Sequence, residues 1–254
     1  MSLNRFVYYH AVIGGWAALL VWLVAEMLFL DSQSLGGVVE ATLIGVLAGV
    51  GIGAGLSFVA AMSSGRRLPR FSSALLPAAL IAAGGGLAGA LLFSALDSLL
   101  SMAWLARSLG WMVMGLGIGA AEGVFENSAV KIRNGLIGGA AGGLLGGLLF
   151  DPIATAGSDM SSRAAAFVIL GVAIGALIGL AHVVLKEAWL TVVDGFGAGR
   201  QLILTEKVTV LGRGDHLPLP LVGYAGRDLE SEHARISREA DGRYVVEDNG
   251  SRIG

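Results

Sequence analysis

Long runs of apolar residues, separated by short polar breaks, occupy the chain as far as residue 186, and beyond it charged residues recur every few positions. A transmembrane helix needs about 20 apolar residues to cross a hydrocarbon core of roughly 30 Å. Six runs approach or exceed that length, at 6–30, 38–62, 74–96, 109–125, 136–150 and 164–185. The pattern therefore predicts a six-helix transmembrane domain at 1–187, followed by a separate domain at 188–254.

The fifth run is the shortest of the six. Its 15 residues would cover only about 22 Å as a helix, at about 1.5 Å per residue. We therefore expect one of three arrangements: snorkelling Lys131 and Arg133 side chains that extend the span, a locally thinner bilayer, or a partly re-entrant segment.

The same stretch is unusually rich in glycine, which is a poor helix former in water. Residues 135–147 read GLIGGAAGGLLGG, with Leu, Ile and Ala between the glycines and no charged residue or proline. Helices in lipid associate through close backbone approach, which small residues permit. Gly135, Gly139, Gly143 and Gly147 form one row at four-residue spacing, and 138, 142 and 146 form a second. We predict glycine-zipper packing on two faces of this helix.

A related spacing recurs in three runs, which suggests an internal repeat. The pattern G-x-[GA]-I-G-A occurs at 49–54, 115–120 and 171–176, and the runs before it end in MLF, LLF and LLF. Because repeats bear on any assignment of fold, we expect three copies of one helical hairpin, at about 6–62, 74–127 and 130–186. The predicted packing glycines of these runs are Gly49, Gly53, Gly115, Gly119, Gly123, Gly171, Gly175 and Gly179.

Composition and charge agree with a membrane protein. The chain is 55% hydrophobic and 14% charged, against roughly 25% charged in soluble domains. Its net charge of −2 argues against a nucleic-acid partner, which would require a basic patch. There is no cysteine, which excludes disulfides and thiolate metal sites.

Lys and Arg are distributed unevenly between the two ends of the runs. Seven lie on one side and two, Arg107 and Arg163, on the other, so the positive-inside rule predicts that both termini are cytoplasmic; we expect an inner membrane of a bacterium. Asp31, Asp97 and Asp151 follow the first, third and fifth runs on the opposite side. We interpret them as solvated helix ends, with an acidic mouth that attracts cations as the alternative.

Few ionisable residues lie inside the runs, and such residues are functional candidates by default. They are Glu26, Glu122, His10 and His182. Glu122 is the strongest candidate, because the equivalent positions in the other repeats are Leu56 and Ile178. It could form a pore or proton site, or it could simply lie at the cytoplasmic interface. We interpret the two histidines as interfacial packing residues.

From residue 188 onward the apolar pattern is typical of short strands. The runs WLTVV, RQLIL, KVTVLG and RYVVED are separated by turn residues, which predicts a β-sandwich. The segments LGR (211–213), HARI (233–236) and DNGSRIG (248–254) resemble a forkhead-associated domain over about 188–254. That resemblance implies phosphothreonine-peptide binding, with Arg213 on the phosphate and His233 bracing the loop.

The sequence departs from this family at two binding positions. Glu230 stands three residues before the histidine, where the family has a phosphate-contacting serine, and Ile253 replaces a peptide-gripping asparagine; Ser231 is a neighbouring substitute. We therefore expect weak phosphothreonine binding. The resemblance also ends before the family's last strands. We expect either that the sequence belongs to a longer protein or that a partner completes an incomplete sheet.

No motif predicts catalysis, a cofactor or a metal site, so we predict a non-enzyme. GFGAGR (195–200) lacks the Lys-Ser/Thr pair of a phosphate loop and is interpreted as a hairpin turn. Two functions remain. The membrane domain could form a channel or transport unit, alone or as an oligomer, which the cytoplasmic domain regulates or localises. Alternatively, the protein is a membrane-held adaptor or a packing subunit of a larger complex. A central opening would favour transport and a closed bundle the adaptor.

Overall fold

The computed structural model describes residues 3–29, 37–64, 68–99, 102–157, 160–185, 188–195, 198–204, 208–223, 228–239 and 242–252. Six helices come first in the chain: α1 (Leu3–Phe29), α2 (Gly37–Ser64), α3 (Leu68–Leu99), α4 (Ala103–Phe125), α5 (Ala129–Thr155) and α6 (Met160–Val184). Five strands follow: β1 (Trp189–Thr191), β2 (Gln201–Ile203), β3 (Val208–Leu211), β4 (Ala234–Arg238) and β5 (Tyr244–Asp248). The predicted division between the two parts falls next to Lys186 and Glu187, which lie outside the described residues.

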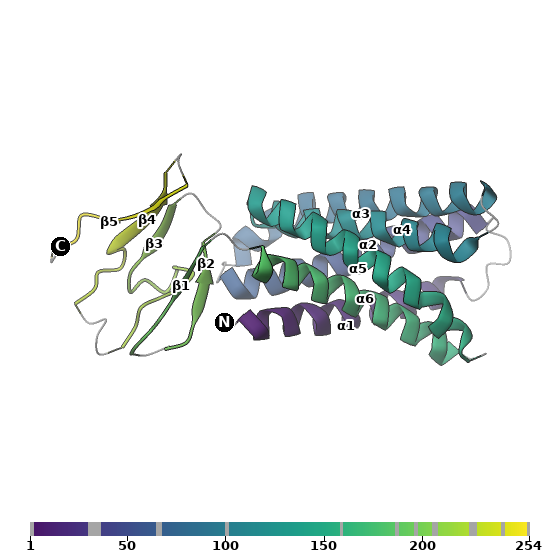
Figure 1. Cartoon of the computed structure of the whole chain (residues 1–254), viewed down its shortest axis with the longest axis horizontal. Helices are drawn as coiled ribbons and strands as arrows, with labels where there is room; N and C mark the ends of the chain where they lie inside the picture. The colour runs from purple at the N-terminus through teal and green to yellow at the C-terminus, as the bar shows by residue number, and fades with distance from the viewer. Residues whose placement is uncertain are drawn as a thin grey trace.

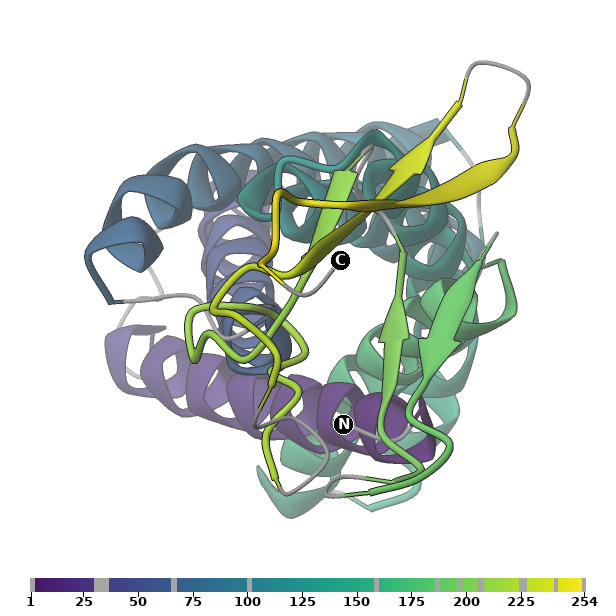
Figure 2. The same cartoon turned by 90° about the vertical axis from the view of Figure 1, so that its left-hand side faces the viewer.

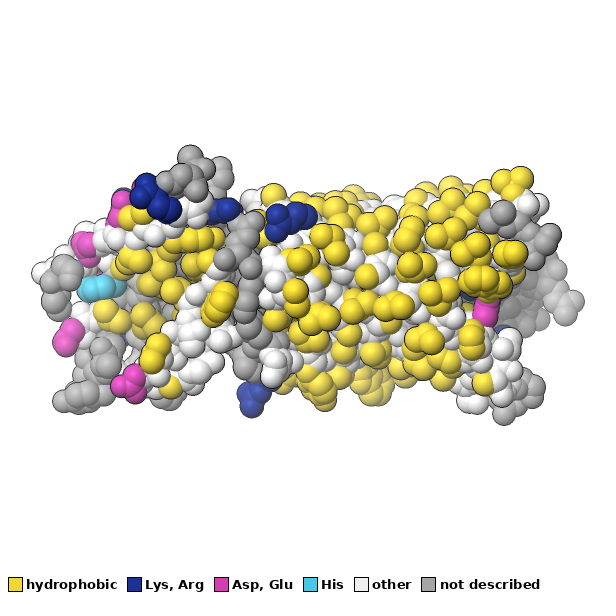
Figure 3. Space-filling model, in the orientation of Figure 1, with side chains coloured by type: hydrophobic (Ala, Val, Ile, Leu, Met, Phe, Trp, Pro, Cys, Tyr) yellow, Lys and Arg dark blue, Asp and Glu magenta, His cyan; other side chains and the backbone are white. Residues whose placement is uncertain are grey.

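All six helices are long and apolar enough to cross a membrane, which indicates an integral membrane protein. Hydrophobic side chains spread over the helical part in the face shown in Figure 3, and the charged side chains lie towards its ends or on the β region. The six predicted spans are confirmed as helices of this kind.

Helix α5 is not re-entrant, which was one of the three arrangements expected for the fifth run, and it includes Lys131 and Arg133 in its first turns. It is one continuous helix of 27 residues, which corresponds to about 40 Å. Ser128 caps its N-terminus, where the hydroxyl oxygen accepts a hydrogen bond from the Lys131 backbone N–H at 3.4 Å. Asn127 supplies the left-handed residue (φ 55°) of the tight α4–α5 turn. The apolar run is shorter than the helix, because the first and last turns of α5 contain polar residues that do not belong to the run.

The helices form a closed ring in chain order. Each helix packs against the next, α1 also packs against α6, and α2 contacts α4 across the ring. The end-on view in Figure 2 shows this arrangement, and Figure 1 shows the β region at the end where α1 begins. We call this the β end of the bundle and the opposite end the distal end.

Apolar layers contributed by α2, α4 and α6 fill the interior of the ring. The isoleucines of the three repeated motifs, Ile52, Ile118 and Ile174, are fully buried in one cluster. Four residues nearer the distal end the layer consists of Ala48, Met114 and Leu170, also buried. Four residues nearer the β end it consists of Leu56, Glu122 and Ile178. Equivalent repeat positions therefore meet in the core, and one layer contains a carboxylate.

The glycine rows of α5 face two different helices. A Cβ atom at Gly135 or Gly139 would overlap backbone atoms of α4, whereas one at Gly138 or Gly142 would overlap backbone atoms of α6. At each of the twelve glycines assigned to packing from the sequence, a Cβ would come within 3.1 Å of a neighbouring helix. At most of these positions the nearest atoms are backbone atoms of the neighbouring helix, so a larger side chain would require the helices to move apart.

The strands form a small two-sheet β region. Strands β1 and β2 pair antiparallel, and the residues between them include the GFGAGR turn. A second antiparallel sheet has the order β3-β4-β5. Strand β4 was not among the runs predicted as strands, because its alternation of Ala, Ile and charged residues is weakly apolar.

Candidate functional site

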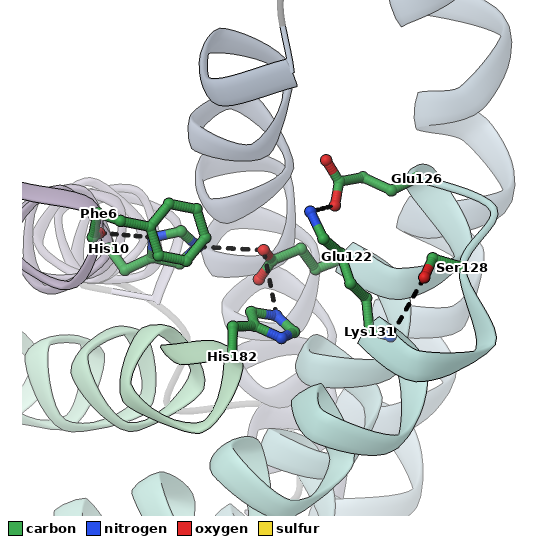
Figure 4. A network of polar contacts seen from close by, with 7 residues as sticks. All are labelled: Phe6, His10, Glu122, Glu126, Ser128, Lys131 and His182. Carbon is green, nitrogen blue, oxygen red and sulfur yellow. Dashed lines mark hydrogen bonds and ion pairs between the residues drawn. The ribbon is translucent and has the colours of Figure 1, made fainter. Parts of the chain in front are cut away.

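Three buried polar side chains meet between α1, α4 and α6, towards the β end of the bundle. His10 Nε2 lies 3.1 Å from Glu122 Oε1, and His182 Nε2 lies 3.4 Å from the same oxygen. His10 and Glu122 are 0% exposed and His182 is 2% exposed. Figure 4 shows the two imidazoles pointing at the carboxylate from different helices. The ring of Phe6 covers His10, with centroids 4.1 Å apart.

The hydrogen bonds of His10 determine where protons lie in this cluster. His10 Nδ1 is 2.9 Å from the Phe6 carbonyl oxygen, and a carbonyl only accepts, so Nδ1 carries a hydrogen. A neutral imidazole has one N–H, which leaves Nε2 as an acceptor that faces a carboxylate oxygen. Two acceptors cannot form a hydrogen bond without a proton between them. The pair is therefore either imidazolium with carboxylate or imidazole with carboxylic acid.

The cluster has further unused capacity for hydrogen bonding. Glu122 Oε2 and His182 Nδ1 are buried and have no hydrogen-bond partner within the described part of the chain. A buried polar group without a partner costs free energy. Glu122 Oε2 and His182 Nδ1 can therefore accept or release a proton, or bind a small polar ligand, without the loss of an existing hydrogen bond.

A second set of polar residues lies between the cluster and the β end. Glu126 and Lys131 form an ion pair across the α4–α5 turn, and both belong to the network in Figure 4. Asn134 is 2% exposed; its amide donates to the Leu185 carbonyl at 3.4 Å and its oxygen accepts from Arg133 Nε at 3.2 Å. Polar groups thus continue from the cluster towards the end of α6.

The interpretation of His10 and His182 as interfacial packing residues did not include their contacts with Glu122. Both are buried within the bundle and both contact Glu122. Their side chains point into the interior because they lie on the helix faces along which α1 and α6 contact each other. Glu122 itself is also buried inside the bundle, near the end of α4, and the choice between a pore or proton site and the cytoplasmic interface stays a prediction. A search for histidines and carboxylates that lie near the same end of different predicted transmembrane helices would have found the cluster.

Charged residues at the distal end form ion pairs. Arg107 and Asp151 form a partly buried pair, and Arg163 Nη2 lies 3.0 Å from Glu26 Oε1. Asp151 is therefore not a freely solvated helix end, whereas Asp97 is exposed and Asp31 lies outside the described residues. A cavity of about 380 Å³ lies beside Arg107, among α2, α3 and α4. Sequence reasoning missed it, because a void has no pattern of its own.

The three motif segments that resemble a forkhead-associated domain come together in the β region. The Arg213 backbone N–H donates to the Glu230 carbonyl and the Gly214 N–H to the Ser231 carbonyl, both at 2.9 Å. His233 Nδ1 accepts from the Glu230 N–H at 3.5 Å, and the Asn249 N–H donates to the His233 carbonyl.

Asp248 closes the turn that follows β5. Its carboxylate accepts hydrogen bonds from the Ser251 hydroxyl and from the backbone N–H groups of Ser251 and Gly250. The bond from the hydroxyl and the backbone bonds lower the pKa of Asp248 below its usual range. The turn therefore holds Asp248 in its charged form.

No family model, curated protein or solved structure matches this chain. Function must therefore be inferred from the sites themselves. Among the described residues, no group of three or more His, Cys, Asp or Glu side chains is arranged to hold a metal ion.

We predict that the β region binds phosphothreonine peptides weakly or not at all. The Glu230 carbonyl accepts a hydrogen bond from the Arg213 backbone N–H at 2.9 Å, so the residue beside Arg213 is an acidic one, which would repel a phosphate. Ile253 lies outside the described residues. The measurement is titration of a phosphothreonine peptide library against the full chain in detergent, with Glu230→Ser expected to strengthen binding. Micromolar binding by the wild type that is abolished by Arg213→Ala would contradict the prediction.

Proposed function

We propose that the helical bundle is a gated transport unit in which the His10–Glu122–His182 cluster takes up and releases a proton. The observation that carries the proposal is the proton that His10 and Glu122 must share inside a membrane-spanning bundle. An unpaired ionisable group that is buried inside a membrane-spanning bundle costs several kcal/mol. The other two repeats have Leu56 and Ile178 at the same level, so the bundle could have been built without the carboxylate.

The order of features along the bundle supports gating rather than an open channel. The cavity at the distal end reaches Met114, the isoleucine layer lies beyond it, and the proton-sharing cluster follows towards the β end. Because Ile52, Ile118 and Ile174 are fully buried, nothing passes through the centre unless helices move. The glycine-lined interfaces provide close-packed surfaces along which such motion is possible, and we regard them as a glycine zipper.

We further propose that the β end is cytoplasmic. The excess of Lys and Arg lies on that side, and the positive-inside rule associates such an excess with the cytoplasm. In this orientation the β region, which we propose to be a partial forkhead-associated domain, is available to cytoplasmic protein partners that regulate or localise the bundle. Assembly into a homo-oligomer or larger complex stays a prediction.

The closed core also supports a second function. A membrane-held adaptor needs a stable anchor and no internal path, and the filled isoleucine layer meets that need. In this case the bundle would only hold the β region at the membrane. The buried cluster would then stabilise the packing of α1, α4 and α6.

Proton uptake into liposomes separates the two functions. The full chain is reconstituted with a pH-sensitive dye inside, and a potassium diffusion potential drives protons inward. We expect acidification faster than in protein-free liposomes, and a loss of about tenfold in Glu122→Gln, which keeps the shape of the side chain but removes its exchangeable charge. Glu239→Gln, an exposed carboxylate of the β region, is the control. A wild-type rate equal to that of protein-free liposomes would favour the adaptor.

A further inference from the structure

The cavity at the distal end has the size of a ligand site. Its volume of about 380 Å³ falls within the 300–1,000 Å³ typical of small-molecule sites. Apolar side chains such as Ile44 and Met114 line it, together with five glycines, Gly37, Gly45, Gly86, Gly89 and Gly110. These surfaces accept an apolar body and offer it few hydrogen bonds.

Aromatic rings form much of the remaining wall. Phe93, Trp111, Phe150 and Phe167 line the cavity, and the Phe150 centroid lies 5.8 Å from that of Trp111 and 5.2 Å from that of Phe167. The faces of such rings carry negative electrostatic potential and attract cations. The Arg107 guanidinium already lies over two of them, 5.6 Å from Phe93 and 5.8 Å from Phe150. This wall is therefore a surface on which a positive charge is stable.

The charges of the cavity also favour a cation. Glu40 and Arg107 are the ionisable residues among its described lining residues. Arg107 is neutralised by its ion pair with Asp151. Glu40 is half-buried on the first turn of α2 and makes no hydrogen bond or ion pair with any residue that the structure describes. The cavity is left with one uncompensated negative charge beside an aromatic wall.

We infer that this cavity binds a lipophilic organic cation, with its ammonium group between Glu40 and the aromatic rings and its apolar body against Ile44 and Met114. Charge complementarity favours this ligand over an anionic amphiphile, which Glu40 would repel, and over a neutral lipid chain, which would leave Glu40 without a partner. The inference names the substrate class of the transport unit proposed above and rests on that proposal, but the binding itself does not require transport.

Binding is measured on the full chain in detergent, by equilibrium dialysis with labelled benzyltrimethylammonium. Neopentylbenzene is the matched competitor, because it has the same shape with carbon in place of the charged nitrogen. We expect saturable binding of the cation. The neutral isostere should compete about tenfold more weakly, because a cation–π contact together with a carboxylate contact strengthens binding by about tenfold. Glu40→Gln should weaken binding of the cation by about the same factor.

Glu26→Gln is the matched control, because it removes the same charge at the same end of the bundle, its partner is Arg163 and it does not line the cavity. We expect it to leave cation binding unchanged. Equal competition by the isostere would show that the cavity is only an apolar void. An equal loss of binding in Glu26→Gln would show that only the surface charge matters. Either result overturns the inference, as does the absence of saturable binding. Proton flux through Glu122 without cation binding would overturn this inference alone, and cation binding without flux would overturn only the transport proposal.

Discussion

Gly143→Leu is expected to disrupt the packing of α5 against α4 and to lower the thermal stability of the protein in mild detergent. A Cβ atom at Gly143 would overlap the carbonyl group of Trp111, which is backbone and cannot turn aside as a flexible side chain would. Overpacking of a core typically costs about 1–3 kcal/mol. The next glycine of the row, Gly139, is just as close to α4, so a leucine side chain at Gly143 finds no free space beside it on this interface.

Gly84→Leu provides the matched control for this experiment. Gly84 lies in α3, another glycine-rich helix, and a Cβ atom there would meet nothing within 4 Å. Both variants replace a helical glycine by leucine, so they share any gain in helix propensity. We expect the melting temperature and the elution volume to change in Gly143→Leu and to stay at the wild-type values in Gly84→Leu. Equal behaviour of the two variants would show that contact with α4 does not matter.

The sequence predicted the parts of this structure that depend on local pattern. Apolar runs of sufficient length indicated six helices, because a membrane-spanning segment must satisfy its own backbone and be apolar throughout. Four-residue spacing of the glycines indicated which faces of α5 approach other helices. The repeat placed Ile52, Ile118 and Ile174 at equivalent positions, and these residues meet in one layer.

The remaining features depend on which helices become neighbours, and no local pattern carries that information. His10 and Glu122 are 112 residues apart, and they meet because the ring closes between α1 and α6. The cavity arises where small residues of α2, α3 and α4 leave space, and Arg107 reaches Asp151 of α5 beside it. In the β region, β4 forms because it pairs with β3 and β5, although its own residues are only weakly strand-like.

The second large effect is expected when Glu122 is replaced by leucine, the residue that the first repeat has at this position. Glu122→Leu leaves His10 Nε2 and the ring nitrogens of His182 buried against an apolar side chain. Removal of one partner from a buried ion pair costs about 3–5 kcal/mol, which corresponds to a fall in melting temperature of about 6–20 °C for a chain of this size. Thermal unfolding in mild detergent measures the change.

The triple variant His10→Leu, Glu122→Leu, His182→Ala separates a structural from a functional role of the cluster. It removes all three polar groups together and gives α6 the alanine that α2 has at the equivalent position, Ala60, which is fully buried. Replacement of a whole buried ion pair by well-packed apolar residues is often neutral or stabilising, so we expect the melting temperature to return to the wild-type value or above it. Proton uptake should nevertheless stay as low as in Glu122→Gln, because no exchangeable proton is left in the core.

The two outcomes of this experiment assign different roles to the cluster. A triple variant as unstable as Glu122→Leu would mean that the cluster holds α1, α4 and α6 together. Recovered stability without proton transport would mean that the bundle retains these charges for proton exchange.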